Sequence, residues 1–85
     1  MAQIEVYTKA FCPYCTRAKM LLNAKGADFR EIDVTMDRKG FEAMVDRANG
    51  RRTVPQVFID GKHVGGSDDL HALDRRGELD RLLAA

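Results

Sequence analysis

Hydrophobic and polar residues alternate at the start of the chain and then take up a helical spacing. The alternation over residues 3–8 predicts a first strand, with Ile4, Val6 and Thr8 on one side and Glu5 and Tyr7 on the other. A helix should begin at Pro13, because the N–H that proline lacks would have no partner in a first turn. One face of this helix is marked by Tyr14, Ala18, Leu21, Leu22 and Lys25. Gly26 fits the position just after the helix.

The middle of the chain repeats this order of strand and helix. Residues 29–34 mix apolar and charged side chains in the manner of a second strand, and residues 36–48 return to helical spacing. Gly40 weakens the start of that helix and Gly50 ends it. We expect core positions at Phe41, Met44 and, further along the chain, Phe58.

A hairpin and two short helical segments complete the pattern. Two apolar runs, 57–59 and 62–64, flank Asp60-Gly61, the dipeptide typical of a tight hairpin turn. Ser67 is placed to cap a helix that carries Leu70 and Leu73. Gly77 interrupts this helix, and a last short helical face is formed by Leu79, Leu82 and Leu83.

The predicted order is βαβαββα followed by a short C-terminal helix. Right-handed crossover of the first βαβ unit makes its two strands parallel, whereas the hairpin is antiparallel. The sequence therefore predicts an α/β fold in which helices flank a four-stranded mixed sheet. Because no repeat or linker interrupts the pattern, we expect a single domain over residues 1–85.

Composition and charge exclude several classes of function. Of the 85 residues, 45% are hydrophobic and 32% are charged, and no run approaches the ~20 apolar residues of a membrane span. Lys and Arg number 14 against 13 Asp and Glu, which lacks the basic excess of a nucleic-acid-binding protein. The N-terminal residues have no secretory pattern, so we expect a cytoplasmic protein. In a reducing compartment, two cysteines indicate catalysis, metal binding or a buried pair.

The two cysteines lie at the predicted start of the first helix. Cys12 takes the cap position and Cys15 the first turn, where three-residue spacing allows a small disulfide ring. Unpaired N–H groups and the positive end of the helix dipole stabilise a thiolate at Cys12, which lowers its pKa and makes it the nucleophile. Lys9 adds a nearby cation. Cys15 should stay more protonated and act as the redox partner.

Two other interpretations of the pair carry less weight. A zinc site needs four ligands, and His63 and His71 lie far downstream without a metal-binding spacing. Inert buried cysteines are common, but they have no reason to stand at a helix start on either side of Pro13. A redox function is therefore favoured, with no metal and with no role for either histidine.

Three motifs in order resemble a bacterial dithiol glutaredoxin. They are Lys9-Ala-Phe-Cys12-Pro13-Tyr14-Cys15, Thr53-Val54-Pro55 and Gly65-Gly66-Ser67-Asp68-Asp69-Leu70. The resemblance covers nearly the whole chain and implies the thioredoxin-like (glutaredoxin) fold. It also implies a glutathione-dependent thiol-disulfide oxidoreductase with no tightly bound cofactor, for which glutathione is the reducing co-substrate.

The resemblance implies a glutathione-binding set around Cys12. A cis Pro55 would turn the Val54 backbone toward the cysteine part of glutathione, next to Thr53. Gly65 and Gly66 would let the backbone approach a ligand. Gly66, Ser67 and the helix start would receive the γ-glutamyl carboxylate, and Asp68 its ammonium. The cationic and aromatic partners of the glycine carboxylate would be Lys9, Tyr14 and Arg47. Without the other motifs, simple capping would explain Ser67–Asp69. Arg51 and Arg52 are expected at a solvated edge.

The resemblance also implies two reaction routes. Cys12 alone would reduce protein-glutathione mixed disulfides, and Cys12 with Cys15 would reduce protein disulfides. The clients would be ribonucleotide reductase or glutathionylated proteins generally, and we expect a monomer without nucleic-acid or membrane partners. Many bacterial members carry a cysteine where Ser67 stands, so no third thiol is involved here.

Two alternatives remain from other classes. One is a glutaredoxin that bridges an iron-sulfur cluster as a carrier, which Pro13 disfavours because cluster binders place a smaller residue there. The other is a thioredoxin-like partner module with no glutathione preference.

Overall fold

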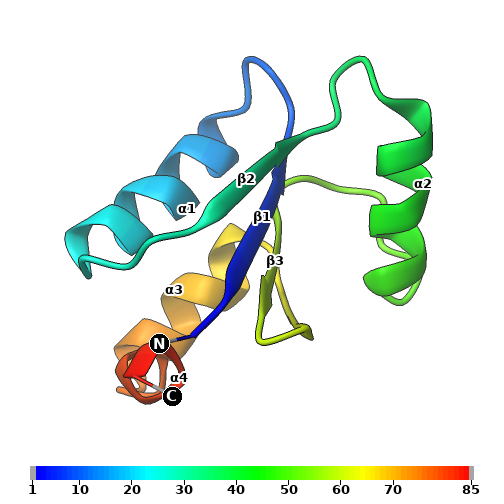
Figure 1. Cartoon of the computed structure of the whole chain (residues 1–85). Helices are drawn as coiled ribbons and strands as arrows, with labels where there is room; N and C mark the ends of the chain where they lie inside the picture. Colours follow the sequence, from blue (N-terminus) through cyan, green and yellow to red (C-terminus); the bar gives the residue numbers. More distant parts are fainter. Residues whose placement is uncertain (1, 85) are drawn as a thin grey trace.

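The computed structural model describes residues 2–84 and has the predicted order of elements (Figure 1). Each predicted strand and helix is present, with bounds that differ from the prediction by about two residues or fewer. The elements are β1 (Ile4–Thr8), α1 (Pro13–Ala24), β2 (Arg30–Asp33), α2 (Arg38–Arg47), β3 (Gln56–Ile59), β4 (Lys62–Gly65), α3 (Ser67–Arg75) and α4 (Leu79–Ala84).

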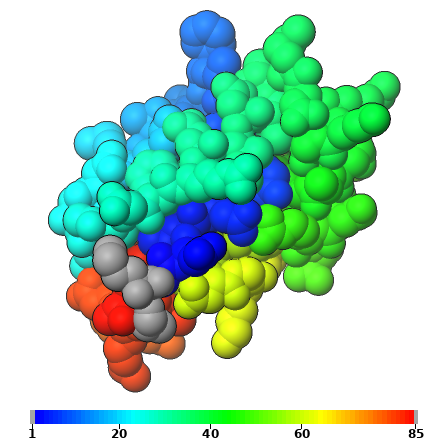
Figure 2. All heavy atoms as spheres, viewed as in Figure 1, coloured from blue at the N-terminus to red at the C-terminus, as the bar shows by residue number. Residues whose placement is uncertain are grey.

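The strands form one mixed sheet in the order β2-β1-β3-β4. β1 is parallel to β2 and antiparallel to β3, and β3 is antiparallel to β4, as the crossover and hairpin predict. Asp60 and Gly61 both have positive φ, which is the geometry of a tight hairpin turn. Because β1 and β2 are parallel, both end at the same edge of the sheet, and the blue segment after β1 projects there in Figure 2.

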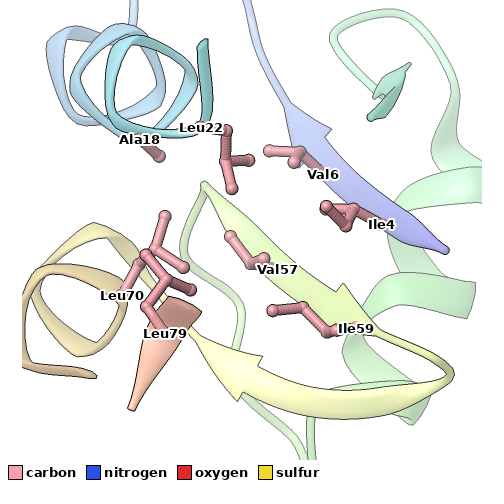
Figure 3. Packing of buried hydrophobic residues seen from close by; sticks show 8 residues of the cluster. All are labelled: Ile4, Val6, Ala18, Leu22, Val57, Ile59, Leu70 and Leu79. Carbon is pink, nitrogen blue, oxygen red and sulfur yellow. The ribbon is translucent and has the colours of Figure 1, made fainter. Parts of the chain in front are cut away.

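The sheet has a hydrophobic core on each face. On one face, β1 and β3 contact α1, α3 and α4 through Ile4, Val6, Ala18, Leu22, Val57, Ile59, Leu70 and Leu79 (Figure 3). On the other face, they contact α2 through Tyr7, Val34, Met44, Val45, Ala48 and Phe58. Two covered faces explain why all four residues of β3 are buried. Met44 and Phe58 are core residues as predicted, whereas Phe41 is only partly buried.

Three local expectations need correction. Tyr14 is exposed, because the buried residues of α1 are Cys15, Ala18 and Leu22 and position 14 falls outside that stripe. Gly66, not Ser67, caps α3; Ser67 is the first helical residue and is buried. The start of α2 is specified by Asp37, whose carboxylate accepts the N–H of Gly40 at 2.9 Å. A Cβ at position 40 would collide with that carboxylate, so glycine suits the cap.

No helix within residues 2–84 combines the length and apolarity that a membrane crossing requires.

Candidate active site

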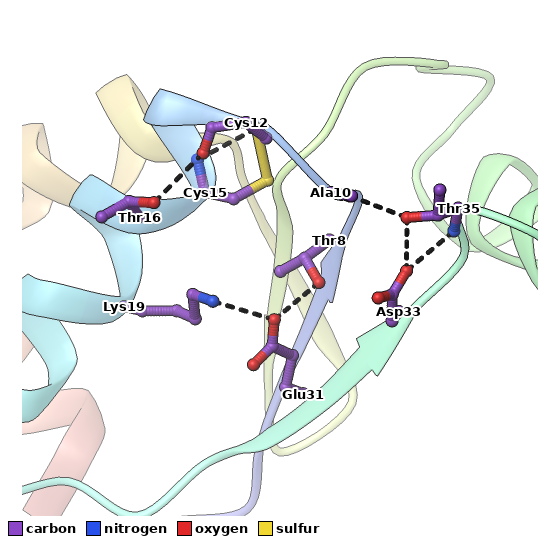
Figure 4. Close-up of polar contacts among 9 residues, drawn as sticks. All are labelled: Thr8, Ala10, Cys12, Cys15, Thr16, Lys19, Glu31, Asp33 and Thr35. Carbon is purple, nitrogen blue, oxygen red and sulfur yellow. Dashed lines mark hydrogen bonds and ion pairs between the residues drawn. A yellow bond between two sulfur atoms is a disulfide. The ribbon is translucent and has the colours of Figure 1, made fainter.

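The two cysteines meet just beyond the carboxyl end of β1 (Figure 4). Cys12 has extended backbone angles and is the N-cap of α1, while Pro13 is the first helical residue. The cysteines form a disulfide with a Cα–Cα distance of 5.2 Å. The backbone N–H of Cys15 donates to Cys12 Sγ at 3.1 Å, so the sulfur fills the place of a capping oxygen. This geometry supports the prediction that α1 stabilises negative charge on Cys12.

The two sulfur-bearing residues differ in access to solvent. Cys12 is half-buried, whereas Cys15 has a relative exposure of 2%. An incoming disulfide can therefore reach Cys12 first, and Cys15 can act only from within the protein. The asymmetry agrees with the predicted roles of attacking and resolving cysteine.

The loop before Cys12 is tied to the end of β2. The N–H of Ala10 donates to Thr35 Oγ1 at 2.7 Å, and that hydroxyl donates to Asp33 Oδ1 at 2.6 Å (Figure 4). Asp33 also accepts the Thr35 N–H, and these two bonds lower the pKa of its carboxyl. The position of the Cys12 loop thus depends on a polar clamp between two parallel strands.

A groove of about 240 Å³ adjoins the disulfide, between the starts of α1 and α3. The Val54–Pro55 peptide bond is cis, as expected, and the carbonyl oxygen of Val54 lies 3.8 Å from Cys12 Sγ. The groove contains seven of the nine residues predicted to bind glutathione, together with Arg51 and Asp69. The seven are Tyr14, Thr53, Val54, Pro55, Gly66, Ser67 and Asp68.

The structure places the other two, Lys9 and Arg47, outside the groove. The Lys9 ammonium lies 4.2 Å from the ring centroid of Phe41. Arg47 donates to Glu5 at 2.8 Å and to the Tyr7 hydroxyl at 2.9 Å. The hydrogen bond from Arg47 lowers the pKa of Glu5, and in return Glu5 raises that of Arg47. Arg47 thus holds α2 to β1, and its charge is already paired.

Arg51, which the sequence interpretation expected at a solvated edge, lines the groove, where Arg47 does not. Its guanidinium donates to Asp69 Oδ2 at 3.0 Å, within the groove. The same carboxylate accepts the N–H of Gly66 at 2.9 Å, and these contacts, the Gly66 bond foremost, lower the pKa of Asp69. Gly65 has φ +122°, and a Cβ there would collide with Asp69. Gly65 therefore makes room for the cap of α3, and its close approach to a ligand stays a prediction.

Asp68 is the groove's other carboxylate. It is exposed, and among residues 2–84 it forms no ion pair. Its charge is thus available to a ligand, in contrast to that of Asp69.

A buried glutamine fixes the position of Thr53. Gln56 Nε2 donates to the carbonyl oxygen and to Oγ1 of Thr53, at 3.0 and 3.2 Å. A carbonyl can only accept, so Gln56 Oε1 must face His63 Nε2, 2.6 Å away, and that nitrogen must carry a hydrogen. Burial, followed by the charge of Arg51, lowers the pKa of His63.

Sequence reasoning gave no role to Gln56, and it expected none for His63. The available signal was a lone amide within the apolar run after Pro55, since a buried polar group needs partners.

A second hollow, of about 570 Å³, is lined by Lys9 and by both Cys12 and Cys15, neither of which lines the groove. In this hollow, Glu31 Oε2 accepts hydrogen bonds from Thr8 at 2.8 Å and Lys19 at 2.9 Å (Figure 4). These contacts, that from Lys19 first, lower the pKa of Glu31. Within the described part of the chain, no three His, Cys, Asp or Glu side chains are grouped as metal ligands would be.

The sheet order, the cysteine pair at the start of α1 and the facing cis Pro55 define a thioredoxin-like thiol-disulfide oxidoreductase. Residues 4–64 match the family model described as "Glutaredoxin". The chain is 55% identical to Glutaredoxin 3 of Escherichia coli K12 over 98% of this chain and 99% of that protein. It is 52% identical to a glutaredoxin of Pseudomonas aeruginosa over the full length of both. The chain belongs to the glutaredoxin family.

Solved structures agree with this assignment. A crystal structure of a buckwheat glutaredoxin-glutathione complex superposes with a TM-score of 0.88 at 36% identity, over 98% of this chain and 77% of that one. The solution structure of a glutaredoxin from Brucella melitensis gives 0.86 at 51% identity, over 98% and 89%. The predicted thioredoxin-like fold and family are confirmed.

Proposed function

We propose that this protein uses glutathione to reduce protein-glutathione mixed disulfides through Cys12, and protein disulfides through Cys12 and Cys15. One observation carries the proposal: the Cys12 sulfur caps α1 and lies 3.8 Å from the carbonyl oxygen of Val54, which lines a groove with backbone, cationic and anionic partners. Glutathione has two carboxylates, one ammonium and one thiol, and so needs each of these partners. A structurally similar relative, the buckwheat protein, was crystallised as a glutathione complex.

The proposed position of glutathione follows from the groove. The backbone of Val54, beside Cys12, pairs with the cysteine residue of glutathione as a neighbouring strand would. The N–H groups that begin α3, at Ser67 and Asp68, receive the γ-glutamyl carboxylate, and the unpaired Asp68 side chain binds the ammonium. Tyr14 and Thr53 face the glycine end, and Arg51 replaces Arg47 as the cation within the groove.

The monothiol route transfers glutathione to the enzyme and then releases it. The Cys12 thiolate attacks the glutathione sulfur of the mixed disulfide, the client-glutathione S–S bond breaks, and the client leaves as a thiolate that takes up a proton. A second glutathione thiolate attacks the Cys12-bound glutathione and releases glutathione disulfide. The net reaction converts one glutathionylated client and one glutathione into a client thiol and glutathione disulfide, and no further cofactor is needed.

The dithiol route uses the buried cysteine. Cys12 attacks a client disulfide and forms a mixed disulfide with the client; Cys15 then attacks Cys12 Sγ, and the client leaves as a dithiol. That step would leave the two cysteines joined in the Cys12–Cys15 disulfide, and their 5.2 Å Cα–Cα distance allows this bond. Two glutathione molecules reduce it again and are oxidised to glutathione disulfide.

A coupled assay with glutathione, glutathione reductase and a small glutathione mixed disulfide tests the proposal. Cys12→Ser should lose activity on both the mixed disulfide and a protein disulfide by about a thousandfold or more, because the nucleophile is gone. Cys15→Ser, the matched variant, should keep mixed-disulfide turnover within about twofold and lose most protein-disulfide reduction. Substantial turnover by the Cys12 variant would disprove the assignment.

A further inference from the structure

The second hollow brings Cys15 together with three polar residues that the proposed reaction does not use. They are Thr8 at the end of β1, Lys19 on α1 and Glu31 on β2. Cys15 and Lys19 stand four residues apart on α1 and therefore share one face of that helix. Thr8 shares a face of the sheet with Val6, which packs against α1 and is paired with Glu31. The three elements thus direct these side chains into the same space.

The three polar side chains form one hydrogen-bonded network. Thr8 Oγ1 donates to Glu31 Oε2 at 2.8 Å, and Lys19 Nζ donates to the same oxygen at 2.9 Å (Figure 4). Thr8 has a relative exposure of 1%, whereas the side chain of Glu31 retains 40%. The lining of the hollow likewise extends from the buried Cys15 to the fully exposed Phe11. The Glu31 carboxylate therefore connects a buried site with solvent.

Cys15 must lose a proton in the dithiol route. Its thiol has to ionise when it attacks Cys12 Sγ, but its burial disfavours the thiolate and limits the access of bulk water. Cys12 is helped by the start of α1, because its sulfur accepts the backbone N–H of Cys15. The buried cysteine needs a different kind of help, which a nearby base can provide.

Glu31 is the base that the second hollow offers. Of the other charged groups in its lining, the ammonium groups of Lys9 and Lys19 already carry their protons. Asp33 accepts both the N–H and the hydroxyl of Thr35. The hydrogen bonds to Glu31, that from Lys19 first, lower the pKa of its carboxyl, so the carboxylate is ionised at neutral pH. It nevertheless remains a much stronger base than water.

We propose that Glu31 accepts the proton of the Cys15 thiol as Cys15 attacks Cys12, and that Thr8 positions the carboxylate for this transfer. The inference rests on the proposed function, because only the dithiol route uses Cys15. The hollow has room for a water molecule that bridges thiol and carboxylate.

The transfer balances as follows. The proton of Cys15 passes to Glu31, the Cys15 sulfur forms a bond with Cys12 Sγ, the bond between Cys12 and the client breaks, and the client leaves as a thiolate. Glu31 then returns its proton to solvent, from which the client thiolate takes one up. Reduction of the disulfide by glutathione uses the same path in reverse, with Glu31 delivering a proton to the departing Cys15 thiolate.

A coloured aromatic disulfide, dithiobis(nitrobenzoate), separates the steps of the two cysteines. Cys12 of the reduced protein attacks this reagent and releases one coloured thiolate, and Cys15 then expels the second, so stopped-flow absorbance records two phases. Glu31→Gln keeps an acceptor for Thr8 and Lys19 but takes up no proton. Its second phase should be slower by about tenfold or more at neutral pH, with the first phase unchanged.

The pH profile of the second phase distinguishes proton transfer from a structural effect. In the wild type its rate should vary little between about pH 6 and 8, because Glu31 is ionised throughout. In Glu31→Gln the rate should rise about tenfold per pH unit over the same range, because hydroxide must now remove the proton. Thr8→Val should slow the second phase by about three- to fivefold, and Thr8→Ser, which keeps the hydroxyl, should restore it.

The controls separate this inference from the proposed function. Glu42→Gln removes a carboxylate that is paired with Arg52 outside the hollow and should change neither phase. If the second phase of Glu31→Gln is unchanged, or is faster because the Lys19 charge is released, Glu31 is not the proton acceptor. If the wild-type protein shows no first phase, Cys12 is not the nucleophile and the proposed function fails as well.

Discussion

α1 and α3 both begin beside the groove, but their first turns carry different charges. The first turn of α1 has no acidic residue, and its cap is the sulfur of Cys12. The first turn of α3 has Asp68 and Asp69, and Asp69 already accepts the Gly66 N–H. Each helix start attracts negative charge to a similar degree. At α1 the positive helix start can stabilise the Cys12 thiolate. At α3 it already stabilises the helix's own carboxylates.

This difference separates reactivity from recognition. A carboxylate in the first turn of α1 would compete with the Cys12 thiolate, while at α3 the unpaired Asp68 adds a site for an ammonium next to N–H groups that favour a carboxylate. The start of α3 therefore suits a zwitterion such as the γ-glutamyl end of glutathione. Four substitutions test whether the start of α1 controls reactivity and the start of α3 controls binding independently of each other.

The largest effect is expected at Gln56, which fixes the segment between the two helix starts. Gln56→Leu leaves the Thr53 carbonyl and the His63 N–H without their partner and should lower the free energy of unfolding by about 1–3 kcal/mol. KM for a glutathione mixed disulfide should rise while the pKa of Cys12 stays the same. Gln56→Glu, which keeps the acceptor for His63, is the comparison. A loss of stability without any rise in KM would show that Thr53, although it lines the groove, has no part in binding glutathione.

Asp68→Asn tests the recognition role of α3. The asparagine keeps size and polarity but loses the charge proposed to hold the ammonium, so KM for the glutathione disulfide should rise by about five- to tenfold. The ionisation of Cys12 should not move. Asp80→Asn, at the far helix α4, provides a charge-matched control outside the groove. An unchanged KM for Asp68→Asn would remove Asp68 from the binding set.

These expectations show which features can be predicted from sequence. The element order depends on short motifs whose chemistry is local, such as Pro13 after a cap or Asp60-Gly61 in a hairpin, whereas the cis bond and most of the groove were expected only from the resemblance to glutaredoxins. The position of Arg47 outside the groove, with Arg51 inside it, is not a local property. It depends on α2 covering the face of the sheet that presents Glu5 and Tyr7, which pair with Arg47 across about 40 residues of sequence. The spacing of charges along the chain carries no such information.

The capping of α3 was missed for a related reason. A serine before a helix is the usual sign of a cap, but the chain reaches α3 from β4 through Gly65 at positive φ, which moves the cap to Gly66. The exposure of Phe11 was equally hidden, because an aromatic residue between Ala10 and Cys12 gives no sign of the direction of its ring. Both features are set by backbone angles that only the folded chain determines.

Thr16→Asp should make the start of α1 resemble that of α3. Thr16 is exposed and lies one turn after Cys12, whose carbonyl accepts its hydroxyl at 3.3 Å. The helix dipole stabilises a carboxylate at this position, but the carboxylate repels the Cys12 thiolate. The pKa of Cys12 should therefore rise by about half a unit, and the rate below that pKa should fall about threefold. Thr16→Asn, without the charge, should do neither. Titration of thiolate absorbance measures the pKa, and the pH dependence of the rate measures its effect on activity. An unmoved pKa would mean that a charge in the first turn of α1 does not reach Cys12.

The smallest effect is expected at Asp69, whose carboxylate accepts the Gly66 N–H at the start of α3. Asp69→Asn retains an acceptor for the Gly66 N–H and loses only the charge, so stability at neutral pH should fall by about 0.5 kcal/mol, a value that allows for the solvent exposure of the Arg51 pair. Because the pKa of Asp69 is lowered in the folded protein, its contribution is complete above the unfolded pKa of ~3.9 and is lost as the pH falls through the lower folded value. Denaturant unfolding of both proteins from neutral pH to pH ~2 should therefore show curves that converge in acid. Curves that stay parallel would place the effect in the shape of the side chain, and the charge at the start of α3 would then have no part in holding the helix.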